Sequence, residues 1–337
     1  MNSGPAEGPE IASSRYMQQT HDDASTPFIS IHPLDAEDAL AMKPMRAAVR
    51  AAKGVRSDTS NARVQFDALM ERVLPPGDVT FETGSVGDIP GLWVHPASSR
   101  SGEAILHLHG GWFNFGSAKA YRHLVGHIAA RAGASAFVPD YRLAPEHPFP
   151  AAVDDAMACY RGIDESGIRR IAITGDSAGG NLALVLASCV TATPVSAKTT
   201  LVGAAAVSPV TDLTLSGRTY ETRADADPLF TRPQVAELVR SYLARADAND
   251  PLASPLQGRF SGLPPIRVHV GDDEVLLDDS RRYVECAAAA GVDARLEVWM
   301  GMFHGFVGSI GTIKAATLAL DAIGRFLIER LQLRSTT

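Results

Sequence analysis

The sequence predicts an α/β fold whose sheet is mostly parallel, with helices on both faces, and three observations favour this class. After Ser101, short apolar runs alternate with helix-like segments, which is the pattern of parallel strands buried beneath helices. Two strand-like runs precede that region, separated by turn-forming residues, so we expect an antiparallel pair at the start of the sheet. The chain closes on a long helix-like segment from Lys314 to Leu333.

The elements follow one another in a regular order. Residues 1–30 are rich in Gly, Ser, Pro and acidic side chains and are predicted to be a disordered tail. From Asp35 to about Leu74, within the segment 31–75, the chain is helix-like, and Pro75-Pro76-Gly77 ends this pattern. Eight strands are then expected, at Val79–Glu82, Leu92–His95, Ala104–Leu108, Ala136–Pro139, Ile171–Thr174, Leu201–Val207, Ile266–Val270 and Arg295–Trp299.

One connection is longer than a crossover between neighbouring strands requires. It separates Val207 from Ile266 and includes the helical pattern RPQVAELVRSYLARA. We expect an insertion at about 213–260 that lies over the sheet and joins the helices of 31–75 as a helical cap. Residues 76–337, apart from this insertion, are then the main α/β domain.

Composition excludes several classes of function. A formal net charge of −7 argues against a nucleic-acid partner, and no apolar run is long enough to span a membrane. The first residues lack the basic start and apolar stretch of a secretory signal, so a cytoplasmic location is expected. The three cysteines, Cys159, Cys189 and Cys286, are widely spaced and predict neither a disulfide framework nor a zinc site.

A candidate nucleophile stands in the stretch IAITGDSAGGNLALVLA. An apolar strand meets Gly175-Asp176-Ser177-Ala178-Gly179, and a helix begins at once, which is the strand–turn–helix context of a nucleophile elbow. Such a turn exposes the Ser177 hydroxyl above the sheet, and the helix N-terminus that follows favours a developing oxyanion. The alternative is a plain glycine-rich turn between strand and helix.

Only two histidines follow Ser177 in the chain, so there are few candidates for its general base. His269 lies in the middle of a predicted strand and is expected to be a sheet residue. His304 lies in the loop after the last strand, at the sheet edge where Ser177 also lies, and is the expected base.

The third group of a triad is an acid that orients the imidazole, and in this fold it stands between the serine and the histidine. The strand Ile266–Val270 ends in GDDEVLLDD, and spacing alone does not choose among its acids, which are Asp272, Asp273, Glu274, Asp278 and Asp279. Some of them could simply cap the next helix. Asp212, after the preceding strand, is a further alternative.

The segment HGGWFNFGS, from His109 to Ser117, leaves its strand through two glycines and then surrounds them with aromatic side chains. The glycines can make a tight turn, or they can bring backbone N–H groups close to a ligand that needs them.

Three segments together resemble the hormone-sensitive-lipase-like family of bacterial esterases (family IV), which has the α/β-hydrolase fold. They are HGGW at 109–112, YRLAPEHPFP at 141–150 and GDSAGG at 175–180, and the likeness extends from about Asp35 to the last helix. The resemblance implies an oxyanion hole at Gly110, Gly111 and Ala178. It also implies that Glu274 occupies the place of the catalytic acid, with Asp273 as the next candidate.

The chain departs from the family pattern at three positions. The acid motif lacks its usual proline, Asp176 stands where the branch with a glutamate acid usually has threonine, and Trp112 replaces a third glycine of many relatives. In the YRLAPEHPFP segment we expect a structural ion pair between Arg142 and Glu146.

The expected function is that of a serine hydrolase that cleaves short- to medium-chain carboxylic esters through an acyl-enzyme, without metal or organic cofactor. Its substrate is a small ester molecule, and the pocket walls are predicted at Trp112, Phe113, Phe115, Leu229 and Phe230. Alternatives are a lactone or amide hydrolase on the same triad, or a non-catalytic binding protein. By resemblance, a homodimer through the sheet edge at Arg295–Trp299 is also expected.

Overall fold

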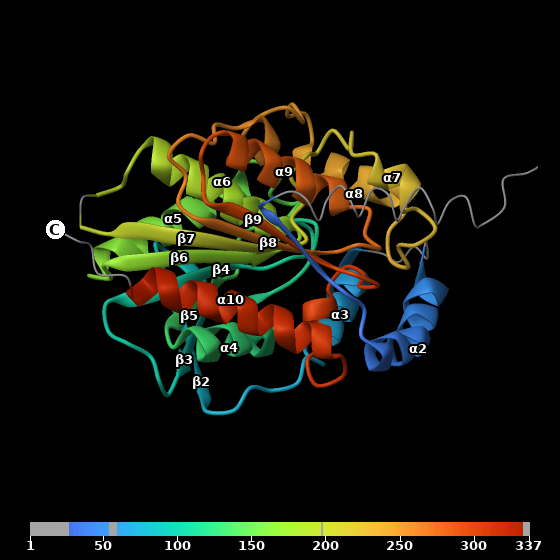
Figure 1. Cartoon of the computed structure of the whole chain (residues 1–337). Coiled ribbons are helices and arrows are strands. Elements are labelled where there is room, and N and C mark those ends of the chain that lie inside the picture. The colour runs from blue at the N-terminus through green and yellow to red at the C-terminus, as the bar shows by residue number, and fades with distance from the viewer. Residues whose placement is uncertain (1–26, 54–58, 197, 333–337) are drawn as a thin grey trace, which may run out of the picture.

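The centre of the molecule is a nine-stranded sheet with the order β1-β9-β8-β7-β6-β4-β5-β3-β2 (Figure 1). The structure is a computed structural model that describes residues 27–53, 59–196 and 198–332. Its strands are β1 (Ile29–His32), β2 (Val79–Val86), β3 (Ile89–Pro96), β4 (Glu103–Leu108), β5 (Ser135–Pro139), β6 (Arg170–Asp176), β7 (Thr200–Val207), β8 (Ile266–Gly271) and β9 (Ala294–Trp299).

Strand pairing is parallel from β1 to β5 in the sheet order and antiparallel only where β3 pairs with β5 and β2. The expected antiparallel start of the sheet is therefore present. Its turn contains Gly87 and Asp88 with φ of 58° and 64°, the left-handed backbone that a two-residue hairpin loop requires. The carboxyl ends of the parallel strands all meet at one edge of the sheet, where ligands bind in folds of this kind.

The sheet has one strand more than the eight that the sequence predicts. β1 lies across the predicted boundary between tail and cap at residue 30, and it pairs in parallel with β9, from Ile29 opposite Leu296 to His32 opposite Trp299. The His32 ring stacks on Trp299 at 3.8 Å, and its Nε2 lies 2.6 Å from Glu297 Oε2. Since β1 covers β9, the expectation that Arg295–Trp299 forms the free sheet edge is wrong. The remainder of the predicted tail, 1–26, lies outside the described residues.

Helices cover both faces of the sheet (Figure 1). On one face α4 and α10 pack together, and on the other α5, α6 and α9 lie over the strands. The helices are α2 (Ala36–Ala52), α3 (Thr59–Met70), α4 (Ala118–Ala132), α5 (Ala151–Glu165), α6 (Ala178–Ala192), α7 (Thr219–Thr222), α8 (Arg232–Leu243), α9 (Leu277–Ala289) and α10 (Lys314–Gln332). Two 3-10 turns, η1 (Pro255–Gln257) and η2 (Phe306–Ser309), complete the elements. No helix in the described parts of the chain is long and apolar enough to cross a membrane.

Local sequence sets where these helices begin and end. Ser117 caps α4 by accepting a hydrogen bond from the N–H of Ala120, and Gly133 ends that helix in the left-handed conformation at φ 60°. Thr231 and Gln234 form a capping box at the start of α8. The turn signals of the sequence therefore fix the helices that flank the predicted site.

The helix α2 is bonded to the chain segment that joins α7 to α8. Three cations spaced one helical turn apart donate to main-chain oxygens of that segment: Arg46 to Ala226, Arg50 to Asp225, and Lys53 to Ala224 and Asp227. The helices α2, α3, α7 and α8 gather at one end of the sheet (Figure 1). Two regions that are distant in sequence are thus joined directly.

The expected ion pair between Arg142 and Glu146 is wrong. Arg142 pairs with Asp155 of α5, with its Nη2 2.7 Å from Oδ1 and its backbone N–H donating to Oδ2. Glu146 instead receives two hydrogen bonds from Arg63 of α3, at 2.7 and 2.9 Å. The physical reason is that Asp155 is almost fully buried beside Arg142 and needs a cationic partner.

Candidate active site

Ser177 occupies a strained turn between β6 and α6. Its φ of 55° and ψ of −120° are unfavourable for any residue with a side chain. Glycine is required on both sides. A Cβ on Gly175 would lie 2.2 Å from the carbonyl oxygen of Gly179, and one on Gly179 would lie 1.9 Å from that of Leu108. The sequence G-x-S-x-G thus has a steric cause.

Several backbone hydrogen bonds hold this turn in its conformation. The N–H of Ser177 donates to Val207 O at 2.8 Å, and its carbonyl accepts from the N–H groups of Asn181 and Val210. The Asn181 side chain ties the same helix to the carbonyls of Val210 and Ala253. The strain at Ser177 is therefore held in place by the strand and loop of β7.

His304 and Glu274 lie in direct contact. His304 stands in the loop after β9 and Glu274 in the loop after β8, and the imidazole Nδ1 is 2.8 Å from Glu274 Oε2. Glu274 is completely buried. Its other oxygen accepts hydrogen bonds from Ser208 Oγ and from the N–H of Gly271, each at 2.7 Å. A buried carboxylate that accepts from three donors is fixed in orientation.

The charges around His304 favour its protonated form. Burial alone works against charging the ring, but the hydrogen bond and charge of Glu274, with the charges of Asp227 and Asp176, outweigh that effect and raise the pKa of His304. His269 behaves in the opposite way, since burial lowers its pKa to about 4 and its Nδ1 accepts from the Trp299 indole at 3.2 Å. The expectation that His269 is a sheet residue is confirmed.

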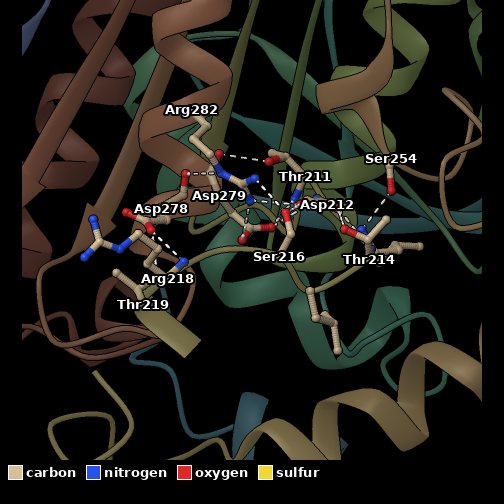
Figure 2. A network of polar contacts seen from close by, with 12 residues as sticks. Thr211, Asp212, Thr214, Ser216, Arg218, Thr219, Ser254, Asp278, Asp279 and Arg282 are labelled. Carbon is tan, nitrogen blue, oxygen red and sulfur yellow. Dashed lines mark hydrogen bonds and ion pairs between the residues drawn. The ribbon is translucent and has the colours of Figure 1, made fainter. Parts of the chain in front are cut away.

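The other acids named by the sequence lie elsewhere. Asp273 forms an ion pair with Arg46 of α2. Asp272 accepts from the N–H of Gly301. Asp278, Asp279 and Asp212 belong to a polar network that joins the start of α9 to the loop after β7 and includes Arg282 (Figure 2). Among these acids, only Glu274 contacts the His304 ring.

The glycines after β4 do not have equivalent surroundings. The N–H of Gly110 donates to Asp176 Oδ1 at 3.1 Å, and a Cβ there would lie 2.4 Å from Asp176 Oδ2. This contact contradicts the expectation that Gly110 helps to bind an oxyanion, because its donor is already committed to a carboxylate. The chain then takes positive φ at three successive residues, 114° at Gly111, 53° at Trp112 and 61° at Phe113.

This left-handed run leaves backbone donors without an acceptor among the described residues. Within the described parts of the chain, the N–H groups of Gly111 and Trp112 have no protein acceptor. Ala178, at the first position of α6, likewise has its N–H outside the intrahelical bonds. Sequence reasoning did not identify the Trp112 N–H, because the folded loop decides which backbone donors lack an acceptor.

The aromatic residues of this loop have different neighbours. Phe113 is buried and stacks on Tyr242 of α8, with 3.7 Å between the ring centroids. The ring centroid of Phe115 lies 6.0 Å from that of Phe66 of α3. The Trp112 ring meets Phe230 edge-on at 5.3 Å, and Phe230 in turn meets the His304 ring at 4.9 Å. Trp112 therefore lies on the His304 side of the loop. Leu229, next to Phe230, is partly buried.

Comparisons with known proteins agree with this architecture. A family model described as the alpha/beta hydrolase fold matches residues 105–308. An acetyl-hydrolase of Streptomyces hygroscopicus is 36% identical over 273 residues, which cover 79% of this chain and 88% of the relative.

Two solved structures are similar over most of the chain. An esterase from the bacterial hormone-sensitive lipase family is 34% identical with a TM-score of 0.81, covering 89% of this chain and all of the other. The esterase EstE5 in crystals soaked with p-nitrophenyl butyrate is 34% identical with a TM-score of 0.82, covering 87% of this chain and 99% of the other. Fold, site and relatives together identify the chain as a member of the hormone-sensitive-lipase-like family of the α/β-hydrolase fold, a serine hydrolase of esters.

Proposed function

We propose that the protein is a carboxylesterase in which Ser177 is the nucleophile, His304 the general base and Glu274 the acid that orients the ring. The observation that carries this proposal is the contact of His304 with the buried Glu274, at the same edge of the sheet as the strained serine. A carboxylate on Nδ1 keeps the proton on that nitrogen and leaves Nε2 able to accept the proton of a serine hydroxyl.

The reaction proceeds by two acyl transfers. Ser177 Oγ attacks the ester carbonyl while His304 Nε2 takes its proton, and a tetrahedral oxyanion forms. When the intermediate collapses, His304 gives that proton to the leaving alcohol and the acyl group remains on Ser177. Water then attacks the acyl-enzyme with the same proton transfers, which release the carboxylic acid and restore the serine.

For the oxyanion we propose the N–H groups of Gly111, Trp112 and Ala178. The support is that these three donors have no acceptor within the described protein, whereas that of Gly110 binds Asp176. Donors that are oriented before the charge develops stabilise it without reorganisation.

We further propose that 31–75 and 213–260 act as one cap over the catalytic domain formed by the rest of 76–337. The hydrogen bonds from α2 to residues 224–227 support this interpretation. Phe230 lies against His304 and Trp112 lies against Phe230, Leu229 precedes Phe230, and Phe115 is in the same loop as Trp112. Bulky walls of this kind limit the length of the substrate. The substrates are therefore esters with short to medium acyl chains.

A series of p-nitrophenyl esters from acetate to laurate tests this proposal. We expect kcat/KM to be highest for acyl chains of about two to eight carbons and to fall for laurate, because the aromatic walls leave no room for a long chain. A fluorophosphonate should label the protein once per chain, at Ser177, as measured by peptide mass spectrometry. Laurate as the best substrate would contradict the assigned walls, and the absence of both hydrolysis and labelling would contradict the esterase itself.

The pH profile provides a second test. The base must be neutral to accept a proton, so activity is lost as the pH falls through the pKa of His304. Because Glu274, Asp227 and Asp176 raise that pKa, the acid limb of kcat/KM should have its midpoint above about 6.5, the ordinary value for histidine. The measurement uses a neutral ester between pH 5 and 9. A midpoint below the ordinary value would show that the assigned charges do not act on the base.

We also propose a cytoplasmic enzyme, which the three unpaired cysteines support. If two copies associate through the sheet edge, the strand that they pair is β1, because β1 covers β9.

A further inference from the structure

Asp227 is a completely buried carboxylate in the segment that joins α7 to α8. Its Oδ1 accepts hydrogen bonds from the N–H groups of Leu229 at 2.8 Å and Phe230 at 3.0 Å. Its Oδ2 accepts from the N–H of Val275 at 3.0 Å. One side chain therefore joins two loops that are 48 residues apart in the chain.

Each of the two loops carries a residue that contacts His304. Val275 is the residue after Glu274, whose carboxylate contacts the His304 ring. Phe230 carries the ring that packs edge-on against His304 at 4.9 Å and against Trp112 at 5.3 Å. Asp227 thus fixes the backbone on two sides of the imidazole, that of the acid and that of the aromatic contact.

The use of a carboxylate here needs an explanation, because burying a charge is costly. Among the described residues its hydrogen-bond donors are main-chain N–H groups, and Lys53 donates to the backbone carbonyl of Asp227 instead of to the carboxylate. A neutral amide has one acceptor oxygen, so it could accept from Leu229 and Phe230 or from Val275, but not on both sides. A carboxylate accepts on both sides, and it also places a negative charge near His304, where the ring becomes an imidazolium in each proton transfer.

The charged groups around His304 come from separate elements. Glu274 approaches from the loop after β8, Asp227 from the segment before α8, and Asp176 from the end of β6. Arg46 of α2 binds Asp273 and the carbonyl of Gly301 in the neighbouring loops. Of the three carboxylates, Asp227 alone belongs to the segment that α2 binds.

We propose that Asp227 is a positioning residue for ester hydrolysis, which holds Phe230 and the acid loop against His304 and stabilises the imidazolium of the transition state. This inference rests on the proposed function. It implies that the segment 224–230 is part of the acid–base apparatus as well as a cover over the substrate.

The test is Asp227→Asn, with Asp212→Asn as the matched control. Asp212 is equally buried, and it holds the loop after β7 through Thr214, Ser216 and Arg282, but it is not among the charges that act on His304 (Figure 2). For Asp227→Asn we expect kcat to fall roughly 10- to 100-fold, with a smaller change in KM. The acid limb of kcat/KM should also move to lower pH, because a charge that raises the pKa of His304 is lost.

Rates are expressed per active site titrated with a fluorophosphonate, so that misfolded protein does not count. The control should lower the melting temperature and leave the midpoint of the acid limb where the wild type has it. An Asp227→Asn enzyme with wild-type kcat and an unmoved acid limb would overturn the proposal. A wild type that neither hydrolyses esters nor reacts with the fluorophosphonate would instead overturn the proposed function.

If Asp227→Asn does not fold, Phe230→Leu tests the same coupling from the other side. Phe230 is only partly buried, and leucine keeps an apolar side chain there while it removes the aromatic edge on His304. A fall in kcat with little change in KM for a short ester supports the coupling. An unchanged kcat contradicts it.

Discussion

The Ser177→Ala variant is expected to lose ester hydrolysis by a factor on the order of 10⁶ in kcat while it keeps the fold. Alanine lacks the hydroxyl that forms the acyl-enzyme, so only binding and the oxyanion donors remain. The hydrogen bonds of Ser177 are made by its backbone N–H and carbonyl, and alanine preserves all of them. The measurement is the rate with p-nitrophenyl acetate, together with a thermal melting curve.

Ser188→Ala is the matched control for this experiment. Ser188 lies on the same helix, α6, and its hydroxyl makes one exposed hydrogen bond of 3.4 Å to the carbonyl of Arg259. We expect this variant to hydrolyse the ester at the wild-type rate. If Ser177→Ala stays active and is still labelled by a fluorophosphonate, the nucleophile is another residue.

Local sequence was enough to predict Ser177 and His304 as candidates, because each follows directly from where a strand ends. Gly175 is required by its contact with Gly179 in the same turn, and Gly179 by its contact with the carbonyl of Leu108 at the end of β4, so the G-x-S-x-G pattern shows in the sequence although part of its steric cause lies in another strand. Parallel strands then bring the ends of β6, β8 and β9 to one edge of the sheet. The sequence therefore predicts the neighbourhood of the site, though not its hydrogen bonds.

What the sequence could not predict depends on contacts between distant residues. β1 is recognisable as a strand only beside β9, where His32 meets Glu297 and Trp299 across more than 260 positions. The role of Gly110 depends on Asp176, which is 66 residues away and could not be placed beside it from spacing. Arg142 pairs with Asp155 and not with Glu146 because the Asp155 carboxylate is buried, and the sequence does not show which carboxylate is buried.

The sequence also could not predict which of three neighbouring acids contacts His304. Asp272, Asp273 and Glu274 are consecutive, so the sequence places all three at the end of β8. In the structure their side chains diverge, Asp272 to the N–H of Gly301, Asp273 to Arg46 and Glu274 to His304. The geometry of the turn after β8 decides which of the three carboxylates faces His304, and three consecutive acids in a sequence do not predict that geometry.

Replacing Glu274 by glutamine is therefore expected to lower kcat by a factor on the order of 10⁴. The N–H of Gly271 must face an acceptor, so the amide oxygen of Gln takes the place of Oε1 and the NH₂ group turns to His304. That NH₂ donates to Nδ1, which places the ring proton on Nε2 and removes the lone pair that accepts the serine proton.

The measurement compares kcat for p-nitrophenyl acetate in Glu274→Gln with that in Asp273→Asn. The control loses only a partly exposed ion pair with Arg46 and should stay within about fivefold of wild type. The opposite ranking of the two variants would assign the acid to Asp273, and it would require a rearrangement of the loop that now points that carboxylate at α2.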